Sequence, residues 1–147
     1  MTRAAFPVVS PADRERWVGA GLWLDRTLHD YFAETVARRP DQVAIVAGER
    51  RLTFADWANE VQRVAAGLVR LGIRAGDVVT VQLPNWPEMC VLQVALSRIG
   101  AVIQPMHIVY RQREMASMLR SCDSRAVILD AEYQGFDYGA ALAEIRA

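Results

Sequence analysis

The chain has 147 residues, 52% of them hydrophobic, so it can bury a core and is too apolar for a disordered segment. Its formal net charge is zero, with 17 basic and 17 acidic residues, and neither a nucleic-acid surface nor an acidic tail is expected. All the basic residues are arginine, which excludes a catalytic lysine within this chain. No apolar run approaches about 18 residues, so we expect no membrane partner, no secretion signal and a cytoplasmic location.

The first part of the chain predicts an irregular arm over residues 1–24 that carries one short helix. Ser10 is placed to cap this helix, since its side chain can accept a hydrogen bond from a free backbone amide. A longer helix is predicted from about Leu28 to Arg39. Thr27 and Asp30 have the spacing of a capping box at its start.

Residues 43–53 predict a small hairpin at the edge of the fold, with its turn at Gly48. The helix that follows has the clearest local start in the chain. Thr53 is predicted as its N-cap and Asp56 as the reciprocal partner, and Gly72 is expected to end it in a left-handed conformation.

Three short apolar segments then alternate with helical segments, a pattern typical of a parallel sheet with right-handed crossovers. The strands are predicted at residues 78–83, 101–103 and 126–129, and the helices at 85–99, 112–121 and 140–145. Asn85 is expected to cap the helix over 85–99, Trp86 to anchor the core, and residues 135–138 to form a loop. We therefore predict one α/β domain of three layers, with a mostly parallel sheet flanked by helices.

Four short motifs occur in a fixed order between Leu52 and His107. They are the Leu52–Trp57 cap, the Gly76-Asp77-Val78-Val79 turn, the Leu83-Pro84-Asn85 break and the Gly100-Ala101-Val102 turn. In this order the sequence resembles the N-terminal part of the adenylate-forming (AMP-binding) enzymes, which include acyl- and aryl-CoA ligases and acid-activating domains. The motifs Val-Gln-Leu-Pro-Asn (81–85) and Gly-Phe-Asp-Tyr (135–138), with His107 after Pro105, are most similar to the aryl-acid-activating and cyclic-acid-CoA-ligase branches.

The resemblance implies a reaction in two steps for the intact enzyme. A carboxylate attacks the α-phosphate of Mg-ATP to give an acyl-adenylate, and a thiol of CoA or of a carrier protein then takes the acyl group. This chemistry needs a glycine-rich phosphate loop, a carboxylate for magnesium and a lysine, and none of the three is found in the sequence. The chain is therefore predicted to be a partial N-terminal subdomain (residues 1–147) without catalytic residues or metal ligands. ATP, magnesium and CoA are expected to serve the intact enzyme, and none of them to bind tightly to this chain alone.

Two residues are candidates for a CoA or acyl site and not only parts of the scaffold. His107 follows a predicted parallel strand, on the side where open α/β sheets bind ligands, although a hydrogen-bonded loop histidine is the simpler interpretation. Some aryl-CoA ligases place a basic residue near the CoA nucleotide a few positions later. The aligned position here is Val109, so the direct correspondence fails, and Arg111 is its nearest substitute.

Two other interpretations remain open at this point. The chain can be a non-catalytic module that complements a separately encoded remainder of the ligase, or that self-associates through an exposed apolar face. It can also be an α/β domain that binds a nucleotide by itself, although it lacks a glycine loop to surround the phosphates.

Overall fold

The computed structural model describes residues 9–146, and the predictions for residues 1–8 of the arm lie outside this range. The helices are α1 (Pro11–Gly19), α2 (Leu28–Arg38), α3 (Phe54–Arg70), α4 (Pro87–Arg98), α5 (Gln112–Ser121) and α6 (Tyr138–Arg146). The strands are β1 (Val43–Ala47), β2 (Arg50–Thr53), β3 (Val78–Gln82), β4 (Val102–Pro105), β5 (Ala126–Leu129), β6 (Glu132–Tyr133) and β7 (Phe136–Asp137). Within residues 9–146, no helix has both the length and the hydropathy to cross a membrane.

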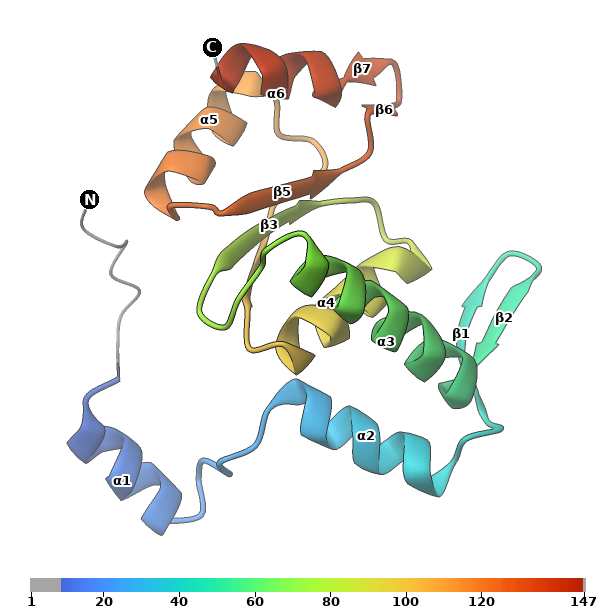
Figure 1. The fold of residues 1–147 in the computed structure, drawn as a ribbon, viewed down its shortest axis with the longest axis vertical. Helices are drawn as coiled ribbons and strands as arrows, with labels where there is room; N and C mark the ends of the chain where they lie inside the picture. The colour runs from blue at the N-terminus through green and yellow to red at the C-terminus, as the bar shows by residue number, and fades with distance from the viewer. Residues whose placement is uncertain (1–8, 147) are drawn as a thin grey trace.

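A three-stranded parallel sheet in the order β4-β3-β5 forms the centre of the fold. Val79 of β3 lies opposite Ile103 of β4 and opposite Ala126 of β5. Figure 1 shows α3 and α4 on one side of this sheet and α5 and α6 on the other. The chain therefore forms the predicted three-layer α/β unit, with the antiparallel hairpin β1-β2 at its edge.

The central strand β3 is buried along its whole length, and its two faces differ in polarity. Val79 and Val81 belong to the main apolar core, which they share with α2, α3 and α4. Side chains alternate along a strand, so Thr80 and Gln82 face the other helical layer. There the Thr80 hydroxyl donates to Oε1 of Gln104 at 2.7 Å.

Helix α3 begins and ends as the sequence predicts. Thr53 Oγ1 accepts from the amide of Asp56 at 3.1 Å, and the Asp56 carboxylate accepts from the amide of Thr53 at 3.0 Å. The hydrogen bonds from Thr53 hold the pKa of Asp56 below its usual value. Gly72 follows the helix with φ 92°, which a residue with a side chain adopts only under strain. The same capping box, built by Thr27 and Asp30, begins α2.

Helix α4 begins one residue later than predicted, and the assignment of Asn85 as its cap is wrong. Trp86 is the N-cap residue and makes no side-chain capping bond. Pro87 occupies the first turn, where its fixed φ suits a helix and its missing N–H has no intrahelical partner to lose. Proline also restricts Trp86 to an extended conformation, and this residue has ψ 159°.

The predicted loop over residues 135–138 is also wrong, because this segment completes a hairpin and starts α6. Tyr133 of β6 pairs with Phe136 of β7. The turn between them places Gln134 at φ 50° and Gly135 at φ 74°. Two successive residues with positive φ match the twist of tight hairpins, but glutamine is an uncommon residue in this conformation.

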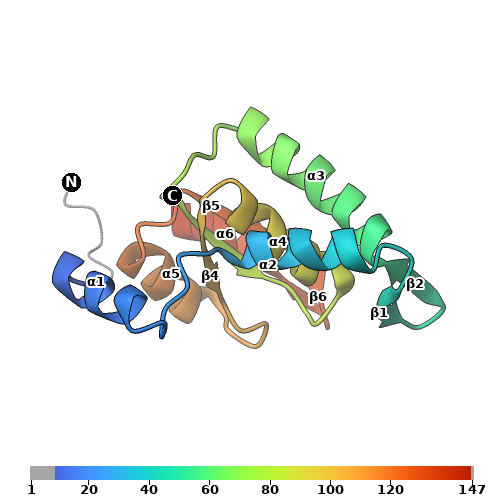
Figure 2. The same cartoon turned by 90° about the horizontal axis from the view of Figure 1, so that it is seen from below.

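Helix α1 and the segment after it form an arm that stands apart from the sheet and its helices (Figures 1 and 2). Ser10 Oγ accepts from the amide of Asp13 at 3.1 Å, as the sequence predicts. None of the α1 residues is buried, and Leu22 beyond the helix is 79% exposed. The rings of Trp17 and Trp23 lie 6.0 Å apart, so the apolar side chains of the arm contact mainly one another.

Candidate functional site

A hollow of about 620 Å³ lies at the carboxyl ends of β3 and β4. Its walls come from residues after β3 (Leu83, Pro84, Asn85), from the end of β4 and the loop after it (Pro105, Met106, His107, Ile108, Tyr110), and from Met89, Met118 and Tyr133. Open α/β sheets bind ligands outside the carboxyl ends of their strands. The hollow is therefore the place in this fold where a ligand site is expected.

The lining of the hollow is mostly apolar and carries no acidic residue, arginine or lysine. Three methionines and two tyrosines contribute to it, and the polar side chains are those of Asn85 and His107. Within residues 9–146, no three His, Cys, Asp or Glu side chains are grouped so that they could hold a metal ion. Such a lining fits a neutral or apolar part of a ligand better than a phosphate or a carboxylate.

Gln82, the last residue of β3, positions the loop that follows β4. Its side chain is fully buried, and its Nε2 donates to the carbonyl oxygens of His107 and Tyr110, each at 3.0 Å. The start of the loop is fixed as well, because the amide of Met106 donates to the carbonyl of Val81 at 2.9 Å. Within the described part of the chain, the Gln82 Oε1 atom is buried without a hydrogen-bond partner.

His107 lies on the rim of the hollow and is exposed. Its Nδ1 accepts a hydrogen bond from the amide of Val109 at 3.3 Å, and its ring lies 6.0 Å from the ring of Tyr110. When Nδ1 accepts, the neutral imidazole carries its proton on Nε2, which leaves Nε2 as a donor. The local hydrogen bond gives His107 a structural part in the loop and leaves one ring nitrogen for a ligand.

Arg111 ends the same loop but contacts different partners. Its guanidinium donates to the carbonyl of Ile108 at 3.0 Å and to the hydroxyl of Tyr138, and it lies 4.5 Å from the centre of the Phe136 ring. Tyr138 in turn donates to the carbonyl of Ile108. Arg111 thus joins the loop after β4 to β7 and α6, and it does not line the hollow.

Sequence reasoning placed His107 in this region but missed Gln82 and Tyr133. A glutamine inside an apolar buried strand is itself a signal, because a buried amide needs hydrogen-bond partners. Its partners cannot be read from local sequence, since they lie 25 and 28 residues farther along the chain. Tyr133 was missed because it belongs to the hairpin that the sequence did not predict.

The chain is similar to known proteins in family, sequence and fold. The family model described as "AMP-binding enzyme" matches residues 32–146. Triostin synthetase I of Streptomyces triostinicus is 38% identical over 118 residues, which is 80% of this chain and 22% of that protein. The 2,3-dihydroxybenzoate-AMP ligase of Bacillus subtilis is 33% identical over 121 residues, again 80% of this chain and 22% of that protein.

Solved structures give the same result for the fold. The apo structure of Mycobacterium smegmatis MbtA aligns with 92% of this chain, and the aligned part makes up 25% of the MbtA chain. The TM-score is 0.79 and the sequence identity is 31%. The N-terminal subdomain of Klebsiella oxytoca NpsA, in complex with 3-hydroxybenzoyl-AMSN, aligns with 72% of this chain, and the aligned part makes up 27% of that subdomain's chain. The TM-score is 0.70 and the sequence identity is 29%. The chain spans 22% to 35% of the length of the first curated relatives that it matches.

Proposed function

The chain belongs to the AMP-binding enzyme family, and from this premise we propose that it is the N-terminal segment of an ATP-dependent acid–thiol ligase. Such an enzyme adenylates a carboxylate with Mg-ATP and passes the acyl group to a thiol of CoA or of a carrier protein. The observation that carries the proposal is the family match over residues 32–146. The relatives include proteins named as AMP ligases and CoA ligases, which supports the same kind of reaction.

In this proposal the segment builds a wall of the ligase and supplies no reacting group. The sequence contains no lysine, and no charged side chain lines the hollow. ATP, magnesium and CoA therefore bind to the intact enzyme, and none of them binds tightly to this chain alone. The hollow contacts a neutral part of the acyl group or of the CoA arm, with His107 at its rim and Arg111 supporting the loop.

Acid-dependent exchange of pyrophosphate into ATP tests this proposal directly. Purified chain 1–147 is assayed with Mg-ATP and benzoate, 2,3-dihydroxybenzoate or octanoate, and we expect no exchange above the acid-free blank. The matched positive test replaces the corresponding segment of the Bacillus subtilis ligase by residues 32–146 of this chain. We expect this chimera to recover exchange that the same ligase loses when the segment is deleted. Exchange by the chain alone would contradict the proposal, and so would a folded chimera without activity.

A second candidate function is an interaction module that complements a separately encoded remainder or self-associates. The observation that favours it is the apolar surface of the arm, where Leu22 is 79% and Leu24 is 54% exposed. Sedimentation velocity over a range of concentrations tests it. Self-association that is lost in a Leu22→Ser, Leu24→Ser double variant supports this function, and a monomer at every concentration contradicts self-association.

A further inference from the structure

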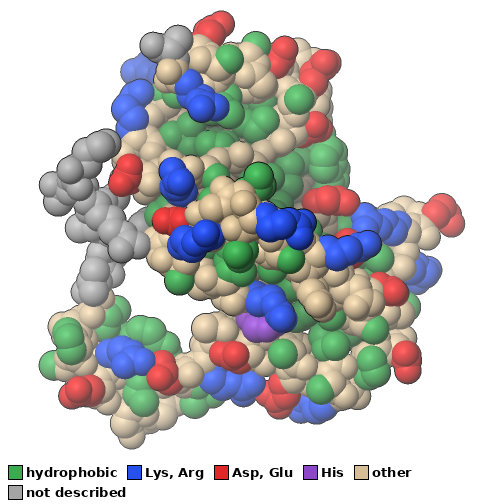
Figure 3. Space-filling view, in the orientation of Figure 1, with side chains coloured by type: hydrophobic (Ala, Val, Ile, Leu, Met, Phe, Trp, Pro, Cys, Tyr) green, Lys and Arg blue, Asp and Glu red, His purple; other side chains and the backbone are tan. Residues whose placement is uncertain are grey.

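The second half of α3 and the turn after it carry an uninterrupted positive charge. Residues 61–76 contain three arginines, Arg63, Arg70 and Arg74, and neither aspartate nor glutamate. All three arginines are exposed. Figure 3 shows Lys and Arg side chains over α3 and over the segment that joins it to β3. This end of the helix is therefore a basic surface on a chain whose formal net charge is zero.

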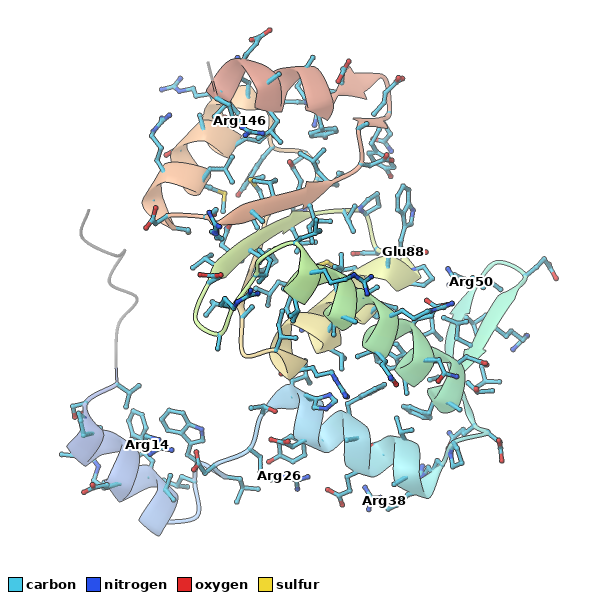
Figure 4. All side chains as sticks on the ribbon, in the orientation of Figure 1. Arg14, Arg26, Arg38, Arg50, Glu88 and Arg146 are labelled. Atoms are coloured by element: carbon cyan, nitrogen blue, oxygen red, sulfur yellow. The ribbon has the colours of Figure 1, made fainter. Side chains whose placement is uncertain are left out.

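The charges of this surface are not compensated within the part of the chain that the structure describes. None of the three arginines forms an ion pair there. Near the start of α3 the situation is different, because Arg50 pairs with Glu60 at 2.7 Å and with Glu88 at 2.8 Å. Figure 4 shows the side chains of Arg50 and Glu88 pointing toward one another. The carboxylate of Asp77, after the last arginine, accepts from the backbone amide of Arg74 at 2.7 Å.

The end of a helix attracts positive charge, but this effect accounts for only part of the surface. Arg70 lies in the last turn of α3. Nη1 of Arg74 donates to the carbonyl of Val69 at 2.9 Å and to the carbonyl of Ile73 at 3.0 Å. Arg63 lies about two turns before Arg70, beyond the reach of the helix dipole. The surface thus has more positive charge than the helix end requires.

Two apolar side chains next to Arg70 are open to solvent. Leu71 is 80% exposed, more than any other large hydrophobic side chain that the structure describes, and Val69 is 42% exposed. Successive residues of a helix point about 100° apart, so these side chains flank Arg70 on both sides. Arginine among apolar side chains is typical of protein–protein interfaces. A nucleic acid would bind the guanidiniums through its phosphates and would leave Leu71 uncovered.

The spacing of the arginines matches a second helix. Arg63 and Arg70 are seven residues apart, so they share one face of α3 and lie about 10.5 Å apart along its axis. Two carboxylates seven residues apart on another helix have the same separation. The surface lies at the amino ends of the strands, because the turn with Arg74 leads into β3, whereas the hollow lies at their carboxyl ends. A partner bound at this surface leaves the hollow accessible.

We propose that the basic end of α3 docks an acidic amphipathic helix of a partner protein. The partner helix places carboxylates seven residues apart opposite Arg63 and Arg70, and its apolar side chains cover Leu71 and Val69. This inference goes beyond the proposed function, since the surface takes no part in the reaction. It holds whether the acceptor thiol belongs to CoA or to a carrier protein.

A peptide-binding experiment on the 147-residue chain tests this inference without any catalytic assay. The probe is a fluorescein-labelled, alanine-based helical peptide with glutamates seven residues apart and leucines between them on the same face. Its counterpart has lysine in place of glutamate, and a short DNA duplex represents a different polyanion. Fluorescence anisotropy measures affinity, and NMR chemical shifts locate the binding. We expect the glutamate peptide to bind, to shift the amides of residues 63–74, and to bind more weakly as salt increases.

Charge-reversal variants make the test specific. Arg63→Glu is expected to weaken the glutamate peptide by about tenfold, since it reverses one charge of a complementary pair. Arg113→Glu, an equal change at an exposed position of α5 on the other side of the sheet, is expected to leave the affinity unchanged. The Arg63→Glu, Arg70→Glu double variant should bind the lysine peptide instead, and a gain of binding cannot result from unfolding.

Four outcomes would overturn the inference. They are no binding of the glutamate peptide, shifted amides outside residues 63–74, the same affinity in Arg63→Glu and Arg113→Glu, and tighter binding of the duplex than of the peptide. Shifts of these amides that grow with protein concentration in the absence of peptide would also overturn it, because a second copy of the chain would then occupy the surface.

Discussion

The side-chain amide of Gln82 donates a 3.0 Å hydrogen bond to the backbone carbonyl of His107, 25 residues farther along the chain. A second bond of the same length reaches the carbonyl of Tyr110. One buried side chain of the central strand therefore holds both ends of the loop that borders the hollow. This arrangement couples the packing of β3 to the shape of the candidate site.

Replacing Gln82 with methionine should destabilise the protein and loosen the loop after β4. Methionine has a similar length but cannot donate to the carbonyls of His107 and Tyr110, and the net loss of a typical hydrogen bond is about 0.5–1.5 kcal/mol. Urea unfolding measures the loss, and hydrogen exchange measures the loop amides. Gln93→Met, on the exposed side of α4, serves as the control and should be nearly neutral. Equal stability of the two variants would contradict this role for Gln82.

Thr53→Ala should lower the free energy of unfolding by about 1 kcal/mol, because it removes the N-cap of α3. α3 contributes Val61, Ala65 and Leu68 to the main core, so fraying of its first turn affects the whole fold. Ser10→Ala removes the same kind of cap from α1, which stands apart from the body. We expect no change in global unfolding for Ser10→Ala. An equal effect of both changes would show that the arm belongs to the cooperative unit.

Stability should fall as the pH drops below the usual pKa of histidine, because His29 resists protonation in the folded state. Partial burial and the charge of Arg98 lower the pKa of His29, and Asp30 offsets this only in part. The unfolded chain then binds more protons than the folded chain between the two pKa values, so stability rises with pH through that window and levels off above the ordinary value of 6.5. Arg98 reaches the ring, with Nη1 at 3.2 Å from His29 Nε2.

Urea unfolding between pH 8 and pH 5 measures this dependence. His29→Gln should make the free energy of unfolding nearly independent of pH between the folded-state and the ordinary pKa of His29. Carboxylates with lowered pKa values, such as Asp30 and Glu34, affect stability only at lower pH. Arg98→Met should narrow the window and weaken the dependence, because removing the positive charge beside the ring raises the folded-state pKa of His29 toward its ordinary value. An unchanged slope in His29→Gln would assign the dependence to another group.

Arg50 should show favourable coupling with Glu60 and Glu88, and the coupling should weaken as salt increases. The three side chains join β2 to α3 and α4. Arg50 and Glu88 are about half exposed to solvent and Glu60 is less so, and the effect of such pairs is small and screened by salt. A double-mutant cycle of Arg50→Met and Glu88→Gln in low and high salt measures it. Glu49→Gln in the hairpin turn is the control with the same charge change. Coupling that is independent of salt would contradict this account.

Local signals predicted most of the fold correctly. The capping boxes at Thr27 and Thr53 lie within four residues of the helices that they start, so the short sequence around them contains the needed information. The helix over residues 112–121 and the strand over 126–129 were predicted with the boundaries that the structure gives. At the start of α4, an asparagine and a proline both fit a helix start, and the proline sets the observed one.

The candidate site was predicted only in part, because its contacts join distant segments. The order of strand and loop places His107 after a parallel strand, and the structure shows it there, beside the hollow. The contacts of Arg111 with Phe136 and Tyr138 depend on the β6-β7 hairpin, which requires Gln134 in a conformation that its sequence does not favour. The binding roles of His107 and Arg111 stay predictions. Trp86 was expected in the core, but it is 39% exposed and borders a groove beside β5.

The alternation along β3 also protects the sheet against slippage. If β3 shifted by one residue against its neighbours, Thr80 and Gln82 would turn toward the apolar core, and Val79 and Val81 would turn away from it. The displaced hydroxyl and amide would lose Gln104 and the loop carbonyls at the same time. Two polar residues in a five-residue strand thus make misaligned pairing costly during folding, before any part of a ligand site has formed.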